Sequence, residues 1–167
     1  MEVRLFELRD WEDLVKGIVL DQNPEWILIH ELPDDYASDG YALLQKNQIS
    51  DHFRDEDTEL SELVLRLKKY QPQIPPGFQI GSIENMLKWI EAQYGLVQVQ
   101  DEEETLAIGT IQSIVANELR LNHIDPLGFQ DPAVVNPIFL SDLQLVQFGS
   151  DYMESIRLLA EYRKSQN

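Results

Sequence analysis

Three segments of the chain carry apolar residues at helical spacing. They are DTELSELVLRLKKY (57–70), SIENMLKWIEAQYG (82–95) and SDYMESIRLLAEYRK (150–164), and the spacing predicts a helix over each. Ser82 and Ser150 suit N-caps, and Gly95 suits a C-terminal exit. The predicted core-facing stripes are Leu60, Leu63, Val64 and Leu67; Ile83, Met86, Leu87 and Ile90; and Tyr152, Ile156 and Leu159.

Short segments rich in β-branched and aromatic residues fill most of the remaining chain. Breaks such as DQNP, PDDYASDG and DPLGFQDP separate them, as is typical of strands joined by turns. QPQIPPGFQIG (71–81) reads as a linker. The predicted strands cover 5–8, 14–20, 25–32, 41–49, 96–100, 105–115, 118–124 and a stretch within 135–149.

A similar order of elements recurs after a shift of about 92 residues. EWILIHEL (25–32) then meets ELRLNHID (118–125), with Glu25 on Glu118, Leu28 on Leu121 and His30 on His123. The shift also brings Gly17 on to Gly109. We therefore predict an internal duplication, in which each copy has four or five short strands and a closing helix.

Strands this short leave exposed edges unless the sheet curls, which favours a small barrel in each copy. A glycine at the same place in each second strand suits a sharply bent barrel strand. The predicted fold class is α+β, mainly β.

The second copy resembles the Sm-like family of small five-stranded barrels in LAIGTIQSIVANELRLNHI followed by IFLSDLQLVQFG. The first copy is similar in LVKGIVLDQNPEWILIHEL and YALLQKNQIS, and the whole pattern resembles an uncharacterised bacterial family with duplicated Sm-like barrels. The resemblance implies two tandem barrels, each followed by an amphipathic helix, with an extra helix at 82–95. The implied domains are 1–70, a linker and connecting helix at 71–95, and 96–167, with the two barrels packed as one unit.

The RNA-binding loops of Sm-like proteins do not transfer to this chain. That family places a basic residue before a glycine near the ring pore, whereas this chain has Ser38-Asp39-Gly40 at the corresponding place. The charge of the chain also disfavours RNA binding, because 30 acidic residues against 13 basic ones give a net charge of −17. Such a surface repels phosphate backbones and anionic membranes, so we expect neither nucleic acid nor membrane as a partner.

Composition and the N-terminal sequence restrict the cellular setting. Cysteine is absent, which excludes disulfides and thiolate chemistry and suits a reducing interior. MEVRLFELRDWEDL lacks the basic start and apolar run of a signal peptide. We expect a cytoplasmic protein that is a monomer or a homodimer.

His30 and His123 are the most evident candidates for catalysis or metal binding. In the functional interpretation they are paired ligands or acid–base groups, assembled in space with Glu25 and Glu118. In the structural interpretation, which we favour, each is a half-buried histidine at a barrel rim. The sequence has no nucleophile elbow and no glycine-rich phosphate loop, so we predict a non-enzymatic protein with no catalytic, cofactor or metal site.

The turn PDDYASDG is the predicted contact surface for a partner. It lacks the ligand spacing of a calcium loop, and we expect Trp26 and Trp89 in the core. The predicted function is a protein-interaction module, for example an acidic inhibitor or immunity-type protein that docks on a basic partner. The runs DEDTE (55–59) and DEEE (101–104) are candidate parts of an acidic docking face, and the alternative is an Sm-like regulator that touches RNA or a nucleotide through a local patch. The predicted contact residues are Asp34, Asp35, Tyr36, Asp39 and Tyr41.

Overall fold

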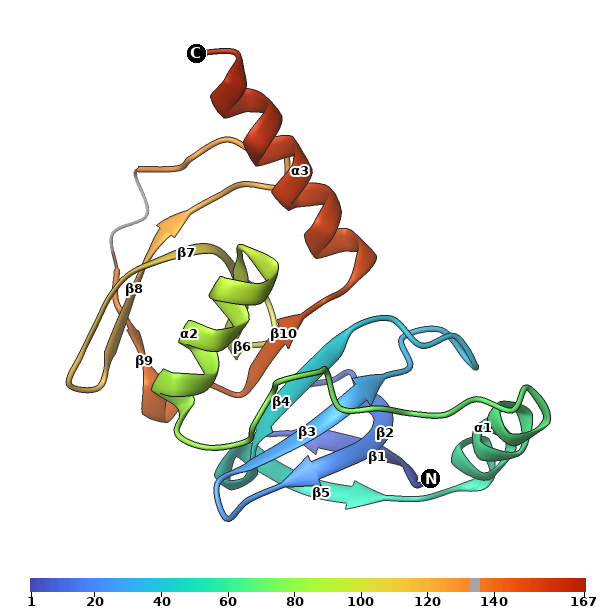
Figure 1. The fold of residues 1–167 in the computed structure, drawn as a ribbon. Coiled ribbons are helices and arrows are strands. Elements are labelled where there is room, and N and C mark those ends of the chain that lie inside the picture. Colours follow the sequence, from blue (N-terminus) through green and yellow to red (C-terminus); the bar gives the residue numbers. More distant parts are fainter. Residues whose placement is uncertain (133–135) are drawn as a thin grey trace.

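Among the residues that the structure describes, ten β-strands pair in one antiparallel sheet, in the order β5-β1-β2-β3-β4-β10-β6-β7-β8-β9. Figure 1 shows this computed structural model, which describes residues 1–132 and 136–167. The N-terminal half of the sheet consists of β1 (Val3–Leu8), β2 (Val15–Gln22), β3 (Trp26–Glu31), β4 (Tyr41–Gln45) and β5 (Ile49–Phe53). The C-terminal half consists of β6 (Val97–Glu102), β7 (Thr105–Val115), β8 (Glu118–His123), β9 (Ile138–Phe139) and β10 (Leu145–Phe148).

In the described part of the chain, three helices and two short 3₁₀ turns accompany the sheet. The helices are α1 (Glu56–Leu67), α2 (Ile83–Tyr94) and α3 (Asp151–Ser165), and the turns are η1 (Lys46–Gln48) and η2 (Leu140–Asp142). In Figure 1, α1 lies beside the N-terminal half, whereas α2 and α3 accompany the C-terminal half. Within the described ranges, no helix is long and apolar enough to cross a membrane.

The prediction of two tandem five-stranded Sm-like barrels is wrong, because the sheet stays open. Closing the N-terminal half would bring β4 beside β5, but β4 pairs with β10, with Leu44 opposite Leu145. Closing the C-terminal half would bring β9 beside β10. Instead, β10 pairs with β4 and β6, and β9 pairs with β8 alone among the described strands. The edges of β4 and β10, which barrel closure would cover within each half, instead join the halves, and β5 and β9 lie at the two ends of the sheet.

The strand register does not support the predicted duplication either. Gly17 lies opposite Glu31 in the β2–β3 pair, and Gly109 lies opposite His123 in the β7–β8 pair. When the two halves are aligned on these glycines, His123 corresponds to Glu31. In the alignment of the sequence segments, His123 corresponds to His30 instead. Because side chains alternate along a strand, this slip of one residue exchanges the faces of the sheet. The two histidines do not occupy equivalent places.

All three predicted helices are present. Ser82 and Ser150 act as N-caps, and their hydroxyl oxygens accept hydrogen bonds from the backbone N–H groups of Asn85 and Met153. Gly95 ends α2 in the left-handed conformation, with φ of 81°. Most predicted strands are also found, but 41–49 and 135–149 are each interrupted by a 3₁₀ turn. Val135 lies outside the described residues.

The buried faces of α1 and α3 differ from the predicted stripes. α1 buries Thr58, Ser61, Glu62 and Leu65, and leaves Leu60, Leu63 and Leu67 exposed. The reason is polar anchoring: Glu62 Oε1 accepts a hydrogen bond from the Val3 backbone N–H at 2.9 Å, and the same carboxylate pairs with Arg54 at 2.8 Å. α3 buries Met153, Ile156 and Ala160, so the expectation is right for Ile156 and wrong for Tyr152 and Leu159. The predicted stripe of α2 is confirmed for Met86, Leu87 and Ile90.

β3 is buried on both faces. Trp26 and Leu28 belong to the largest apolar cluster, which also contains Leu87 of α2. Ile27 and Ile29 point the other way, into a second cluster that contains Phe6. The prediction that Trp26 is a core residue is confirmed, and Trp89 packs at the margin of the same large cluster.

Candidate functional site

The predicted contact turn is divided between exposed and structural residues. Asp34 and Asp35 are exposed, and Asp35 has a φ of 36°. Tyr36 is only half-buried. Asp39 Oδ1 accepts a hydrogen bond from the backbone N–H of Asp151 at the start of α3, at 3.0 Å. Asp39 therefore fixes the turn to the C-terminal half.

Tyr41 belongs to an aromatic ladder inside the molecule. Its ring stacks on His30 with centroids 4.7 Å apart, and on Phe148 with centroids 5.5 Å apart. The His30 ring also contacts the Tyr70 hydroxyl through Nδ1. Burial lowers the pKa of His30, against an opposing effect of Asp39. The sequence places His30 correctly as a half-buried residue and misses its tyrosine partners.

A groove with a volume of about 460 Å³ lies between the halves of the sheet, next to this turn. We call it the acidic groove. Apolar side chains form much of its lining, together with two glutamines, one lysine and three carboxylates. The lining residues are Leu5, Trp11, Leu14, Val15, Lys16, Glu31, Leu32, Pro33, Asp35, Asp57, Gln100, Leu145 and Gln147.

Two glutamines of the C-terminal half hydrogen-bond to residues at the groove. Gln144 is buried, its side-chain oxygen accepts from the Trp11 indole N–H, and its Nε2 donates to the Arg9 carbonyl oxygen at 2.9 Å. Gln147 Nε2 donates to both carboxylate oxygens of Glu31 at 2.9 Å. The groove is therefore complete only when β10 joins the N-terminal half.

Glu31 is the chemically unusual group of the acidic groove. Burial raises the pKa of its carboxyl to about 7; the Gln147 hydrogen bond lowers it and the Asp39 charge raises it further. Near neutral pH this carboxyl is thus divided between its neutral and charged forms. A cation placed beside it favours the charged form, so binding of a basic group is coupled to release of a proton.

Acidic segments that are distant in the sequence meet around the groove. Asp57, from the run 55–59, pairs with Lys16 at 2.6 Å, and the same ammonium donates to the Asp35 carbonyl oxygen at 3.2 Å. Glu103, from the run 101–104, accepts hydrogen bonds from the backbone N–H groups of Glu12 and Asp13 at 2.9 and 2.8 Å. Asp57 of the first run thus lines the same hollow as Asp35, whereas Glu103 of the second run binds the backbone between the lining residues Trp11 and Leu14.

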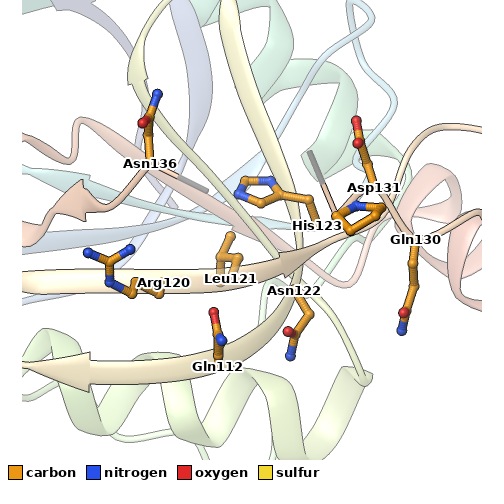
Figure 2. Close-up of a pocket in the computed structure, with 9 residues that line it drawn as sticks. Gln112, Arg120, Leu121, Asn122, His123, Gln130, Asp131 and Asn136 are labelled. Atoms are coloured by element: carbon orange, nitrogen blue, oxygen red, sulfur yellow. The ribbon is translucent and has the colours of Figure 1, made fainter. Parts of the chain in front are cut away.

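His123 lies in a separate pocket of about 350 Å³, shown in Figure 2. β8 supplies Arg120 and Asn122 next to His123, and the segment that follows β8 supplies Asp131. Burial lowers the pKa of His123, and the nearby Asp131 raises it. No serine, threonine, cysteine, lysine or tyrosine is among the lining residues that the structure describes. The described lining therefore offers an imidazole, a carboxylate, a guanidinium and side-chain amides, but no hydroxyl, thiol or amine.

The structure does not bring the two histidines together. β4, β10, β6 and β7 lie between β3 and β8 in the sheet. In the part of the chain that the structure describes, no group of three or more His, Asp or Glu side chains is arranged to hold a metal ion. The paired-histidine interpretation therefore has no geometric support.

Comparison with known proteins gives no further assignment. The chain matches no protein-family model, no curated protein and no solved structure.

Proposed function

We propose that the protein is a non-enzymatic interaction module that binds a basic segment of a partner protein in the acidic groove. The observation that carries the proposal is the meeting of acidic segments around one partly apolar hollow. Of the charged lining residues, three are carboxylates, and the single lysine is already paired with Asp57. A partner's lysine or arginine would supply the missing positive charge.

The net charge of the whole molecule also favours a basic partner. With a net charge of −17, it attracts cationic proteins over distances beyond direct contact, and such attraction speeds association. The apolar lining, which includes Trp11 and Leu145, gives an aliphatic or aromatic side chain beside the basic one a place to pack. An inhibitor or immunity-type protein that neutralises a cationic enzyme is one form of this function.

A titration of the isotope-labelled protein with a short peptide of alternating lysine and leucine tests the proposal by NMR. We expect amide shifts concentrated at Trp11, Lys16 and Gln100, and affinity that falls about tenfold between about 50 and about 300 mM salt. A peptide with glutamate in place of lysine should leave the spectrum unchanged.

A matched pair of variants separates the groove from overall charge. Asp35→Asn/Asp57→Asn removes two charges from the groove and should weaken the basic peptide about tenfold. Glu154→Gln/Glu161→Gln removes two charges from the exposed face of α3 and should have little effect. Equal losses for the two variants, or shifts spread over the whole acidic surface, would contradict a defined groove.

A further inference from the structure

A second pocket, with a volume of about 520 Å³, opens in the N-terminal half and has the opposite polarity. We call it the basic pocket. It is distinct from the acidic groove: Arg4 and Phe6 of β1 line the basic pocket, whereas Leu5, between them, lines the groove. Successive side chains of a strand point to opposite faces, so the two hollows lie on different faces of β1.

The floor of the basic pocket is apolar. Phe6 and Ile27 are buried, and Val19 and Ile49 are partly buried beside them in the same apolar cluster. Arg4 pairs across the sheet with Gly17, which adds no side chain to this face. The volume lies within the range of about 300 to 1,000 Å³ that is usual for small-molecule sites. The floor therefore suits the apolar body of a small ligand.

The rim of the basic pocket carries hydrogen-bond donors. Arg4 Nη1 lies 2.8 Å from His52 Nδ1. Because a guanidinium only donates, the His52 Nδ1 accepts, and its Nε2–H remains as a donor. Lys46 Nζ donates to the Gln22 side-chain oxygen at 2.8 Å, and an ammonium has two further N–H groups.

The charges of the basic pocket leave one positive charge uncompensated. Arg4 and Lys46 are cations, and Glu2 is the carboxylate that lines the same pocket and pairs with Arg4 Nε. With His52 accepting at Nδ1, the sum is two positive charges and one negative charge. A ligand with a single negative charge balances this sum, whereas a dianion leaves an excess negative charge in a protein whose net charge is already −17.

We propose that the basic pocket binds a small organic monoanion, in which a carboxylate meets Lys46 and Arg4 at the rim and an apolar body packs on Phe6 and Ile27. Charge-assisted hydrogen bonds from the two cations orient the carboxylate. This site does not depend on the proposed function of the acidic groove, because it uses other residues and a ligand of opposite charge.

NMR titration with 3-phenylpropionate, its neutral amide and phenyl phosphate tests the proposal. We expect 3-phenylpropionate to shift the amides of Arg4, Phe6 and Lys46, and to bind about tenfold more tightly than the amide. Phenyl phosphate, a dianion for much of its population near neutral pH, should bind more weakly than the carboxylate.

Two lysine variants provide a matched control. Lys46→Gln should weaken 3-phenylpropionate about tenfold, and Lys88→Gln, which removes a charge from the exposed surface of α2, should leave its affinity unchanged. His52→Ala, at an exposed position, provides a second variant if Lys46→Gln fails to fold.

Specific outcomes would overturn this proposal. They are equal affinity for the acid and its amide, tighter binding of phenyl phosphate, unchanged affinity in folded Lys46→Gln and His52→Ala, or no shift around the pocket with any probe.

Discussion

The two segments EWILIHEL and ELRLNHID have similar sequences and different surroundings. β3, within the first segment, has four consecutive buried residues from Trp26 to Ile29. β8, within the second, buries only Leu119 and Leu121, which alternate with more exposed residues. Both strands lie between two neighbours in the sheet, so hydrogen-bonded position alone does not explain the contrast. The difference comes from what covers each face: β3 separates two apolar clusters, and both Leu119 and Leu121 of β8 pack into the same one.

Truncation of matched side chains should give the largest contrast between the strands. With the glycines aligned, Leu28 corresponds to Arg120, because Leu28 lies opposite Asp21 and Arg120 lies opposite Ser113. Leu28→Ala leaves a cavity in a filled core and should lower the free energy of unfolding by about 3 kcal/mol. Arg120→Ala, on the more exposed face of β8, should cost less than about 1 kcal/mol. Urea denaturation measures both, and similar costs would contradict the difference in burial between these matched positions.

The two strand glycines provide a contrast of intermediate size. A Cβ at Gly17 would meet the end of the Ile29 side chain at 2.7 Å and the backbone carbonyl oxygen of His30 at 2.8 Å, whereas a Cβ at Gly109 would overlap more deeply with the backbone carbonyl oxygen of Asn122. Because the backbone overlap is deeper at Gly109, Gly109→Ala should cost about 2 kcal/mol and Gly17→Ala about 1 kcal/mol. Thermal unfolding of both variants checks the order, and a larger loss for Gly17→Ala would show that β2 is the more constrained strand.

The smallest contrast concerns how stability depends on pH at Glu31 and His123, which correspond when the two glycines are aligned. The pKa of Glu31 is raised to about 7 in the folded protein, so the folded state holds more protons than the unfolded state between about pH 4.5 and 7. Stability therefore falls as the pH rises through this window. Glu31→Gln should recover about 1 kcal/mol at about pH 8, which is less than the full shift implies because water reaches the groove.

His123 should give the opposite sign. Burial lowers its pKa in the folded protein, so the unfolded state takes up the proton first, and stability is lost as the pH falls below about 6.5. His123→Gln should therefore flatten the acid side of the stability curve and leave the alkaline side unchanged. Denaturation midpoints across the pH range test both variants, and a change on the same side for both would contradict the assignment.

Local signals in the sequence place the helices well and their buried faces poorly. The Ser82 cap and the Gly95 exit define α2 within one residue, because both act on neighbouring backbone groups. The face of α1 is decided by Glu62, whose carboxylate reaches the backbone of Val3. An apolar stripe contains no information about such a distant polar contact, so the stripe predicts the wrong environment for Leu60 and Leu63.

The sheet and the acidic groove depend on contacts between distant residues. Whether β4 closes a barrel or meets β10 is decided by residues about a hundred positions later. The sequence shows the acidic runs 55–59 and 101–104 as possible parts of a docking face, but only the fold brings Asp57 of the first into the groove lining and Glu103 of the second on to the backbone of Glu12 and Asp13. Glu31 carried no signal of its own, because its raised pKa comes from burial in the folded molecule.

The position of β10 has a consequence for synthesis on the ribosome. The outer edge of β4 has to wait for β10, which is made about a hundred residues later. Until that strand leaves the exit tunnel, the nascent chain presents an unpaired apolar edge of the kind that recruits chaperones or pairs with another chain. The emergence of β10 thus ends this exposed stage of folding.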